Sequence, residues 1–303
     1  MIIDQATKLR ELVKPQQHIE FESNEPNRRA VKTIAVTSGK GGVGKTSVVT
    51  NLGLLCAIWG YRVAIFDADL SLANVDVLLG VRPHYNLSHV ISGEKELSDI
   101  LAQGPNGIVL IPASCGIESL ANLTSTQMER LLNDLEQFTR SMDFLFIDTG
   151  AGVSNNVLPF VLAAGEVIIV TTPEPTAITD AYAMIKIITQ RRRMINEDGQ
   201  SLKLLINMVN SSMEAEDVME RIKLVIKRFL DTTVEFGGYI LKDERVGEAI
   251  MTQNPLVLSS PQSKASKCIF KIAKQIADKR PQDKRTKNFF FEAMQWEQQA
   301  DSS

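Results

Sequence analysis

The segment SGKGGVGKTS at residues 38–47 constrains the fold of this chain more than any other feature. It follows a short β-branched, apolar run and opens a helical one. Gly39, Gly44, Lys45 and Thr46 fit the spacing G-x-x-x-x-G-K-[ST] of a phosphate-binding loop between a strand and a helix. Glycines let backbone N–H groups converge on phosphate oxygens, and the helix N-terminus adds partial positive charge. The predicted nucleotide contacts are Gly39, Lys40, Gly41, Gly42, Val43, Gly44, Lys45, Thr46 and Ser47.

Seven short apolar runs alternate with helical stretches after residue 30. The runs span 31–37, 62–67, 107–112, 143–148, 166–172, 202–209 and 234–241. The expected helices include 45–58, 125–140, 154–164, 177–193, 214–230 and about 262–279. Near-continuous apolar strands separated by helices indicate a parallel sheet that is covered on both faces. We therefore expect an α/β fold over residues 31–280, with a doubly wound, mainly parallel sheet.

Composition excludes several other classes of protein. Of 303 residues, 44% are hydrophobic and 23% charged, which is ordinary for a globular chain and excludes a mostly disordered one. No apolar run approaches the roughly 20 residues of a membrane span. The three cysteines lie far apart without a C-x-x-C pair, which argues against a disulfide scaffold and a metal cluster. A cytoplasmic protein is expected.

Carboxylates follow two of the predicted strands. Asp67 and Asp69 come at the end of one apolar run, and Asp148 ends another. The carboxyl ends of parallel strands meet at the ligand-binding crevice of this architecture. Asp148 and the Thr46 hydroxyl are therefore candidates to hold Mg²⁺. For Asp67, a cap at the strand end is the alternative interpretation.

A second lysine at the start of the loop, Lys40, makes the motif more specific. The sequence KGGVGKT resembles the deviant phosphate loop of the MinD/ParA ATPase superfamily. In that family two subunits enclose two ATP molecules, and this lysine reaches the nucleotide of the other subunit. The resemblance implies Mg²⁺-dependent ATP hydrolysis by a homodimer formed with ATP. Its implied catalytic residues are Lys40, Lys45 and Asp69, its metal-site residues are Thr46, Asp67 and Asp148, and Asn74 and Asp76 continue the switch region after Asp69.

Four further residues take roles from the same resemblance. Glu174 and Asp180, in the segment TPEPTAITD, would lie at the dimer face with Lys40 and Asn74. A proline turn followed by a helix cap is the alternative interpretation of this segment. Asn207 occupies the adenine-reading position, since an amide can both donate to and accept from a purine edge; a buried structural Asn is the alternative. Asp243 lies on the adenine side, but the proline usual in that loop is missing.

The N-terminal residues indicate which branch of the MinD/ParA superfamily this chain resembles. Residues 1–12 predict a short amphipathic helix, and residues 13–30 a flexible linker. Asp4, Gln5, Ala6, Leu9 and Arg10 match the D-Q-A-x-x-L-R motif of the FlhG (FleN) family, MinD-like ATPases that control flagellar number and placement. In that family the helix activates FlhF, a GTPase of the signal-recognition-particle type. A glutamine suits the role because it can orient a hydrolytic water.

The C-terminus predicts a membrane anchor. Between residues 264 and 287, nine basic and two acidic residues give a charge of +7 in a chain whose net charge is −3. Residues 281–303 combine a basic linker with a broad apolar stripe, which suits a helix lying in the membrane interface beside anionic headgroups; packing of the aromatic residues onto the domain is the alternative. The stripe comprises Phe289, Phe290, Ala293, Met294 and Trp296. The text PQSKAS at 261–266 also resembles the FlhG family.

These resemblances imply a protein that binds reversibly to the inner face of the cell membrane, at the cell pole in some settings. Implied partners are an FlhF-like GTPase, flagellar switch or C-ring proteins and a flagellar transcriptional regulator, with no direct nucleic-acid contact. One alternative is a MinD-type division-site regulator, which the 30-residue N-terminal extension disfavours. Another is a ParA-type DNA segregation ATPase, which the aromatic tail disfavours because nonspecific DNA binding needs charge and no apolar stripe.

Overall fold

The computed structural model describes residues 31–69, 74–112, 125–152, 158–194, 201–230 and 232–278. Eight strands form one sheet in the order β3-β4-β2-β5-β1-β6-β7-β8. All neighbouring strands are parallel except β3 and β4. The strands are β1 (Lys32–Ser38), β2 (Val63–Ala68), β3 (Ala102–Gln103), β4 (Val109–Pro112), β5 (Phe144–Ala151), β6 (Glu166–Thr171), β7 (Ser201–Val209) and β8 (Glu235–Leu241).

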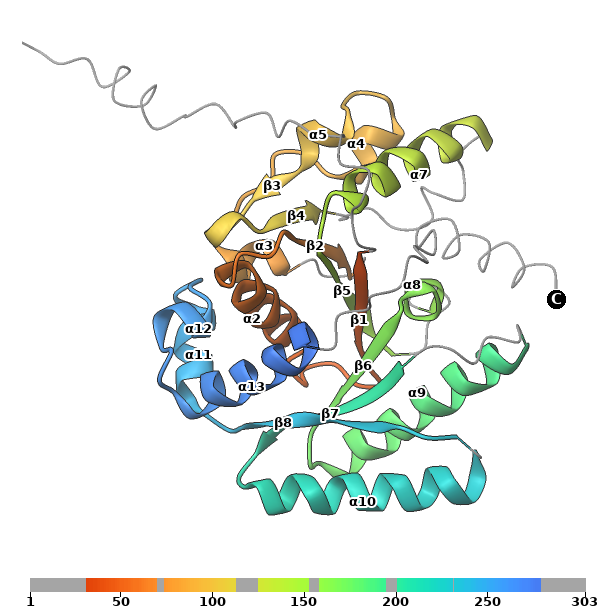
Figure 1. Cartoon of the computed structure of the whole chain (residues 1–303), viewed down its shortest axis with the longest axis vertical. Coiled ribbons are helices and arrows are strands. Elements are labelled where there is room, and N and C mark those ends of the chain that lie inside the picture. The colour runs from red at the N-terminus through yellow and green to blue at the C-terminus, as the bar shows by residue number, and fades with distance from the viewer. Residues whose placement is uncertain are drawn as a thin grey trace, which may run out of the picture.

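Helices cover both faces of the sheet (Figure 1). One face packs against α2 (Lys45–Ile58), α3 (Val75–Leu79), α11 (Glu244–Met251), α12 (Leu256–Ser259) and α13 (Lys264–Asp278). The other face packs against α4 (Leu87–Ile91), α5 (Leu97–Ile100), α7 (Ser125–Arg140), α8 (Leu158–Ala163), α9 (Pro175–Met194) and α10 (Ser212–Phe229). A short 3-10 helix, η1 (Pro105–Gly107), precedes β4. The predicted doubly wound, mainly parallel fold is confirmed.

The central strands are buried along nearly their whole length because each has helices above and below it. This burial explains why their sequences show continuous apolar runs rather than alternation. Two separate apolar cores result, one on each side of the sheet. The carboxyl ends of β1, β2 and β5 meet at one edge, where Asp67 pairs in register with Asp148.

Helix α13 is fixed to the rest of the domain at both ends. At its start, the Asp243 carboxylate accepts from the Ala265 N–H at 3.2 Å, and Ser263 Oγ accepts from the Ser266 N–H at 3.1 Å. The serines of the PQSKAS segment are thus explained as a helix cap. At its last turn, the Ile276 carbonyl accepts from Lys32 Nζ at 3.0 Å.

Lys32 belongs to a buried ionic cluster at the amino edge of the sheet. Its Nζ lies 3.2 Å from Glu166 Oε2, and Lys203 Nζ pairs with the other oxygen of Glu166 at 2.5 Å. The three side chains come from the first residues of β1, β6 and β7 and are at most 10% exposed. This charged cluster (Lys32, Glu166 and Lys203) therefore joins three strands to the end of α13.

Candidate nucleotide-binding site

The predicted phosphate loop connects β1 to α2 as expected. Gly44 sits at the N-terminal end of α2 with a φ of +92°, and Gly42 has a φ of +78°, both in the left-handed region that favours glycine. A Cβ added to Gly39 would lie 2.2 Å from the Asp180 carbonyl oxygen in α9. The glycines are therefore required by the backbone path and by close packing.

Side chains from outside the motif hold the loop in shape. Ser38 Oγ donates to the Lys40 carbonyl at 2.6 Å. Asn207 Nδ2 donates to the Val43 carbonyl at 2.8 Å, and Asn207 Oδ1 accepts from the Met208 N–H. Asn207 is thus buried against the loop, as the structural alternative expected, and adenine reading by this residue stays a prediction.

Asp148 provides the observation that favours a metal ion. The carboxyl group is buried, and its Oδ1 has no hydrogen-bond partner among the described residues. Burial raises the pKa of Asp148 to about 7, although a hydrogen bond from the Thr46 hydroxyl lowers it. An orphaned buried carboxylate oxygen beside a hydroxyl is a donor set that suits Mg²⁺. Asp148 and Thr46 therefore fit the predicted ion.

Asp67 acts as a structural cap in this conformation. Its Oδ1 accepts from the Asp69 N–H at 3.3 Å and its Oδ2 from the Val75 N–H at 3.2 Å, where α3 begins. Burial raises the pKa of Asp67 to about 6, while these two N–H groups lower it. The cap explains the residue without a metal, so direct support of Mg²⁺ by Asp67 stays a prediction.

Lys45 is surrounded by the charges that its predicted role requires. It is the first residue of α2 and 7% exposed. Burial lowers the pKa of Lys45, while the carboxylates of Asp148 and Asp69 raise it. The structure therefore brings Lys45, Thr46, Asp69 and Asp148 into one electrostatic site at the carboxyl edge of the sheet.

Lys40 contacts its own chain. Its Nζ lies 2.8 Å from Glu174 Oε2 and 3.0 Å from Thr176 Oγ1, at the start of α9. Both partners of the ion pair are accessible, with 39% of the Lys40 side chain and 65% of the Glu174 side chain exposed. The hydrogen bond from Lys40 lowers the pKa of Glu174. Two predicted dimer-face residues thus meet within one subunit.

The remaining predicted positions have local roles in the structure. Asn74 is exposed at the N-terminal end of α3, and Asp180 lies in α9 behind Gly39. Asp243 caps two helices: its carboxylate accepts from Arg245 at the start of α11 as well as from α13. Partial burial raises the pKa of Asp243, but these N–H groups more than offset it, so the pKa is lowered overall. A nucleotide contact by Asp243 stays a prediction.

Sequence reasoning missed Asn51. This buried side chain in α2 donates to the Ser47 carbonyl at 2.7 Å and accepts from the Val257 N–H of α12 at 2.9 Å. The signal was a single amide inside the otherwise apolar stretch that follows the loop. Asn51 thus connects α2, the helix that follows the phosphate loop, to α12.

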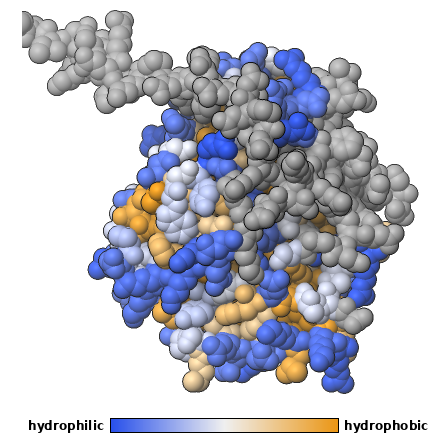
Figure 2. All heavy atoms as spheres, viewed as in Figure 1, coloured by the Kyte–Doolittle hydropathy of each residue, from blue (hydrophilic) through white to orange (hydrophobic). Residues whose placement is uncertain are grey.

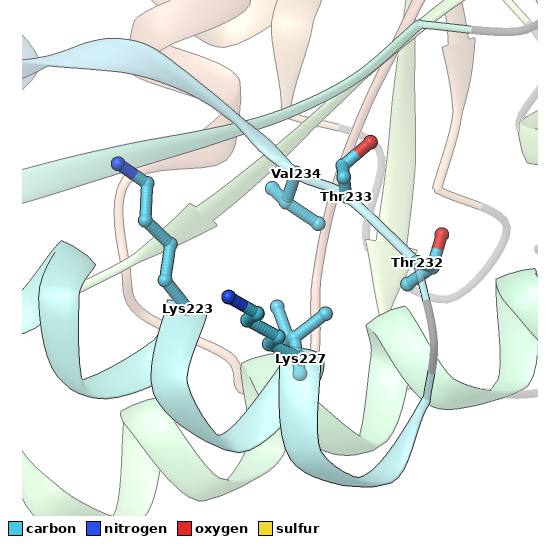
Figure 3. A pocket seen from close by; sticks show the side chains of 6 residues that line it. Lys223, Lys227, Thr232, Thr233 and Val234 are labelled. Carbon is cyan, nitrogen blue, oxygen red and sulfur yellow. The ribbon is translucent and has the colours of Figure 1, made fainter.

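A pocket of about 470 Å³ lies away from this site, where α10 ends and β8 begins (Figure 3). Its described lining residues are Lys223, Ile226, Lys227, Thr232, Thr233 and Val234. None of these carries a carboxylate, and the pocket lies at the amino edge of the sheet. The phosphate chemistry therefore does not involve it.

Two predicted segments lie outside the described residues. They are the activator motif (Asp4, Gln5, Ala6, Leu9 and Arg10) with its linker, and the tail with Phe289, Phe290, Ala293, Met294 and Trp296. No helix within the described ranges is long and apolar enough to cross a membrane. Cys56 and Cys268, the cysteines of the described part of the chain, are buried and unpaired.

A strand–loop–helix with an embedded lysine and carboxylates at the carboxyl edge of a parallel sheet defines a P-loop nucleotide hydrolase. The family model described as "ParA: NUBPL iron-transfer P-loop NTPase" matches residues 29–277. The antiactivator FleN of Pseudomonas aeruginosa is 42% identical over 81% of this chain and 86% of its own length. The flagellum site-determining protein YlxH of Helicobacter pylori is 40% identical over 74% of this chain and 73% of its own. The chain therefore belongs to the MinD/ParA family of P-loop ATPases, in the branch that contains FleN and YlxH.

Structural comparisons agree with this assignment. The cell-division ATPase MinD of Pyrococcus furiosus has a TM-score of 0.64 and 26% identity, covering 82% of this chain and 98% of that one. MinD of Pyrococcus horikoshii, solved as a complex with Mg-ADP, has the same fold with a TM-score of 0.64, covering 84% of this chain and 100% of that one. The predicted family and the predicted ATP-hydrolase class are confirmed.

Proposed function

We propose that this protein is an ATP-driven switch that controls the number and placement of flagella. The observation that carries the proposal is the deviant phosphate loop with Lys40, in a chain 42% identical to the antiactivator FleN. The YlxH relative is named a flagellum site-determining protein, and the FleN relative is named an antiactivator. The 30% identity to MinD of Bacillus subtilis supports division-site control as the second candidate.

In the proposed reaction, ATP binds with its phosphates in the loop at 39–47. Lys45 would contact the β- and γ-phosphates, and Thr46 and Asp148 would hold Mg²⁺, which would supply charge neutralisation at the phosphates. Asp69 orients the attacking water. Its position after β2, close enough to influence the pKa of Lys45, supports that role.

Dimerisation is proposed to depend on Lys40. The side chain is exposed enough to leave Glu174 and reach the nucleotide of a second subunit. An exposed ion pair contributes little stability because both charges are solvated. Lys40 can therefore leave Glu174 and bind a phosphate of the second subunit's ATP at little cost in free energy. ATP binding would in this way promote dimerisation.

The two terminal segments are proposed to carry the interactions with the partner GTPase and with the membrane. Residues 1–12 would stimulate an FlhF-type GTPase through Gln5, and residues 281–303 would bind the inner face of the cell membrane. Two tails on an ATP-bound dimer bind a membrane more strongly than one, so attachment would follow the nucleotide state. Flagellar switch proteins and a transcriptional regulator are further proposed partners, and localisation is proposed to be cytoplasmic, with reversible membrane association.

The first test is the GTPase rate of FlhF with a peptide of residues 1–20, beside the same peptide carrying Gln5→Ala. We expect stimulation by the first peptide and none by the second. Absence of stimulation with folded FlhF would contradict the flagellar assignment and favour division-site control.

The second test measures sedimentation with anionic vesicles for the full chain and for a chain lacking residues 288–303. We expect the deletion to abolish vesicle binding and to leave ATP-dependent dimerisation intact. Unchanged sedimentation would eliminate the tail as the anchor.

A further inference from the structure

The outward side of α13 carries a row of lysines. Lys264, Lys267, Lys271 and Lys274 are exposed, whereas the residues on the opposite side of the helix are buried in the core. At 3.6 residues per turn these four lysines fall within roughly a quarter of the helix circumference. We call them the basic face of α13. Hydrophilic residues cover this part of the surface in Figure 2.

An apolar spot adjoins the basic face. Phe270 is 47% exposed and its ring meets that of Trp59, at the end of α2, edge-on at 5.3 Å. The neighbouring Ile58 is 44% exposed. If the lysines only kept the helix surface hydrated, exposed apolar side chains beside them would not be expected. Lysines around exposed aromatic and aliphatic groups are the pattern of a surface that meets lipid headgroups and the upper acyl chains.

The charge on this surface is not neutralised by the helix itself. Asp278, the last residue of α13, is the only acidic residue of the helix, against four lysines. The sequence that follows, residues 279–287, adds five basic residues and one acidic residue. In the sequence, the lysines of α13 are thus followed directly by the basic stretch before the aromatic tail.

The basic face also has a fixed orientation. Asp243 and Ser263 hold the start of α13, and Lys32 holds its last turn. Figure 1 shows α13 lying beside α2 and β8. Because the helix is fixed, all its exposed lysines can contact one flat surface at the same time. A flexible segment would not hold its lysines in such an arrangement.

We propose that the basic face of α13, with Phe270, is a second membrane-contact surface, formed by the folded domain and matched to an anionic phospholipid bilayer. It lies against the headgroups while the tail inserts, and so sets the orientation of the domain on the membrane. The inference rests on the proposed membrane association and adds the surface that the domain turns toward the lipid. Each lysine near an anionic leaflet contributes roughly a fivefold gain in binding, and the gain falls with added salt.

The test compares two full-length charge-reversal variants in vesicle sedimentation. One is Lys267→Glu with Lys271→Glu on α13. The matched control is Lys223→Glu with Lys227→Glu on α10, which changes the net charge equally but on the opposite face of the sheet. Vesicles are made from equal parts of phosphatidylglycerol and phosphatidylcholine, and from phosphatidylcholine alone. Basal ATPase activity should be unchanged in both variants, because neither pair belongs to the nucleotide site.

We expect the α13 variant to bind anionic vesicles at least about tenfold more weakly than the control variant at low salt, with the difference shrinking as salt is added. A third variant, Phe270→Ser, should weaken binding in a salt-independent way. Equal binding by the two charge-reversal variants would overturn the inference, as would a tenfold loss that occurs with duplex DNA and not with vesicles. If the unaltered chain fails to bind anionic vesicles, the proposed membrane association itself is wrong. The GTPase assay with the N-terminal peptide tests the flagellar assignment independently of both vesicle results.

Discussion

The charged cluster at the amino edge of the sheet predicts a large effect from one small substitution. Glu166 is the only counter-charge within the cluster for Lys32 and Lys203, whose side chains are 6% and 10% exposed. Glu166→Gln keeps the shape of the side chain and removes its charge. Two ammonium groups then remain buried within hydrogen-bonding distance of one neutral amide. For comparison, two unit charges about 5 Å apart repel each other by roughly 3 kcal/mol at an effective dielectric constant of 20.

Removal of one partner from a buried ion pair typically costs about 3–5 kcal/mol. A domain of this kind has a free energy of unfolding of about 5–15 kcal/mol, so the variant should lose roughly a fifth or more of its stability. Urea unfolding followed by circular dichroism, without nucleotide, measures the loss. Glu174→Gln is the matched control: its pair with Lys40 has a similar length of 2.8 Å, but Glu174 is 65% exposed, so its unfolding midpoint should hardly move.

The pH dependence of the same variant provides a second check. Burial lowers the pKa of Lys32, and Glu166 is the main group that raises it again. Without Glu166 the folded-state pKa falls further below the unfolded value of about 10.4. Between these two pKa values the unfolded chain binds more protons, so the free energy of unfolding rises with pH. Part of the lost stability should therefore return as the pH rises from the lowered folded-state pKa toward the unfolded value of about 10.4. A loss below about 1 kcal/mol, or no recovery at high pH, would refute the description of the cluster as buried and charge-coupled.

Other substitutions test the nucleotide site. Lys45→Ala should abolish binding of a fluorescent ATP analogue; retained affinity would contradict a phosphate contact. Asp69→Ala should still dimerise with ATP, measured by gel filtration, yet hydrolyse it slowly, and fast turnover would remove Asp69 from the reaction. Gly39→Ala should lose nucleotide binding while keeping its circular dichroism, because the new Cβ would lie 2.2 Å from a carbonyl oxygen of α9. Asn51→Ala should lower the free energy of unfolding by about 1–3 kcal/mol, since it leaves a buried N–H of α12 without its acceptor; an unchanged urea midpoint would show that water replaces the amide.

The long elements could be predicted from sequence because each has a clear pattern. Predicted helices at 45–58 and 125–140 coincide with α2 and α7, and each predicted strand overlaps an observed one. The short elements α3, α4, α5 and α12 were missed, since four or five residues are too few to show a helical period. The two-residue antiparallel strand β3 was missed for the same reason.

The phosphate loop was predictable because its residues are adjacent in sequence. The contacts that shape it were not, because they join residues far apart in the chain. Lys40 and Glu174 are separated by 134 positions, and Asn207 and Val43 by 164. The double cap by Asp243 likewise depends on where α11 and α13 meet, which no local pattern specifies.

The hydrogen bond between Lys32 and Ile276 also determines how the domain would carry a mechanical load. The segment before β1 enters, and the segment after α13 leaves, within a few residues of this contact. The phosphate loop lies at the other end of β1, about 20 Å away for a strand of seven residues. If one terminal segment held a partner and the other a surface, as proposed, a pull between them would be borne by the charged cluster. The nucleotide end of the domain would then stay unstrained and accessible to the proposed second subunit.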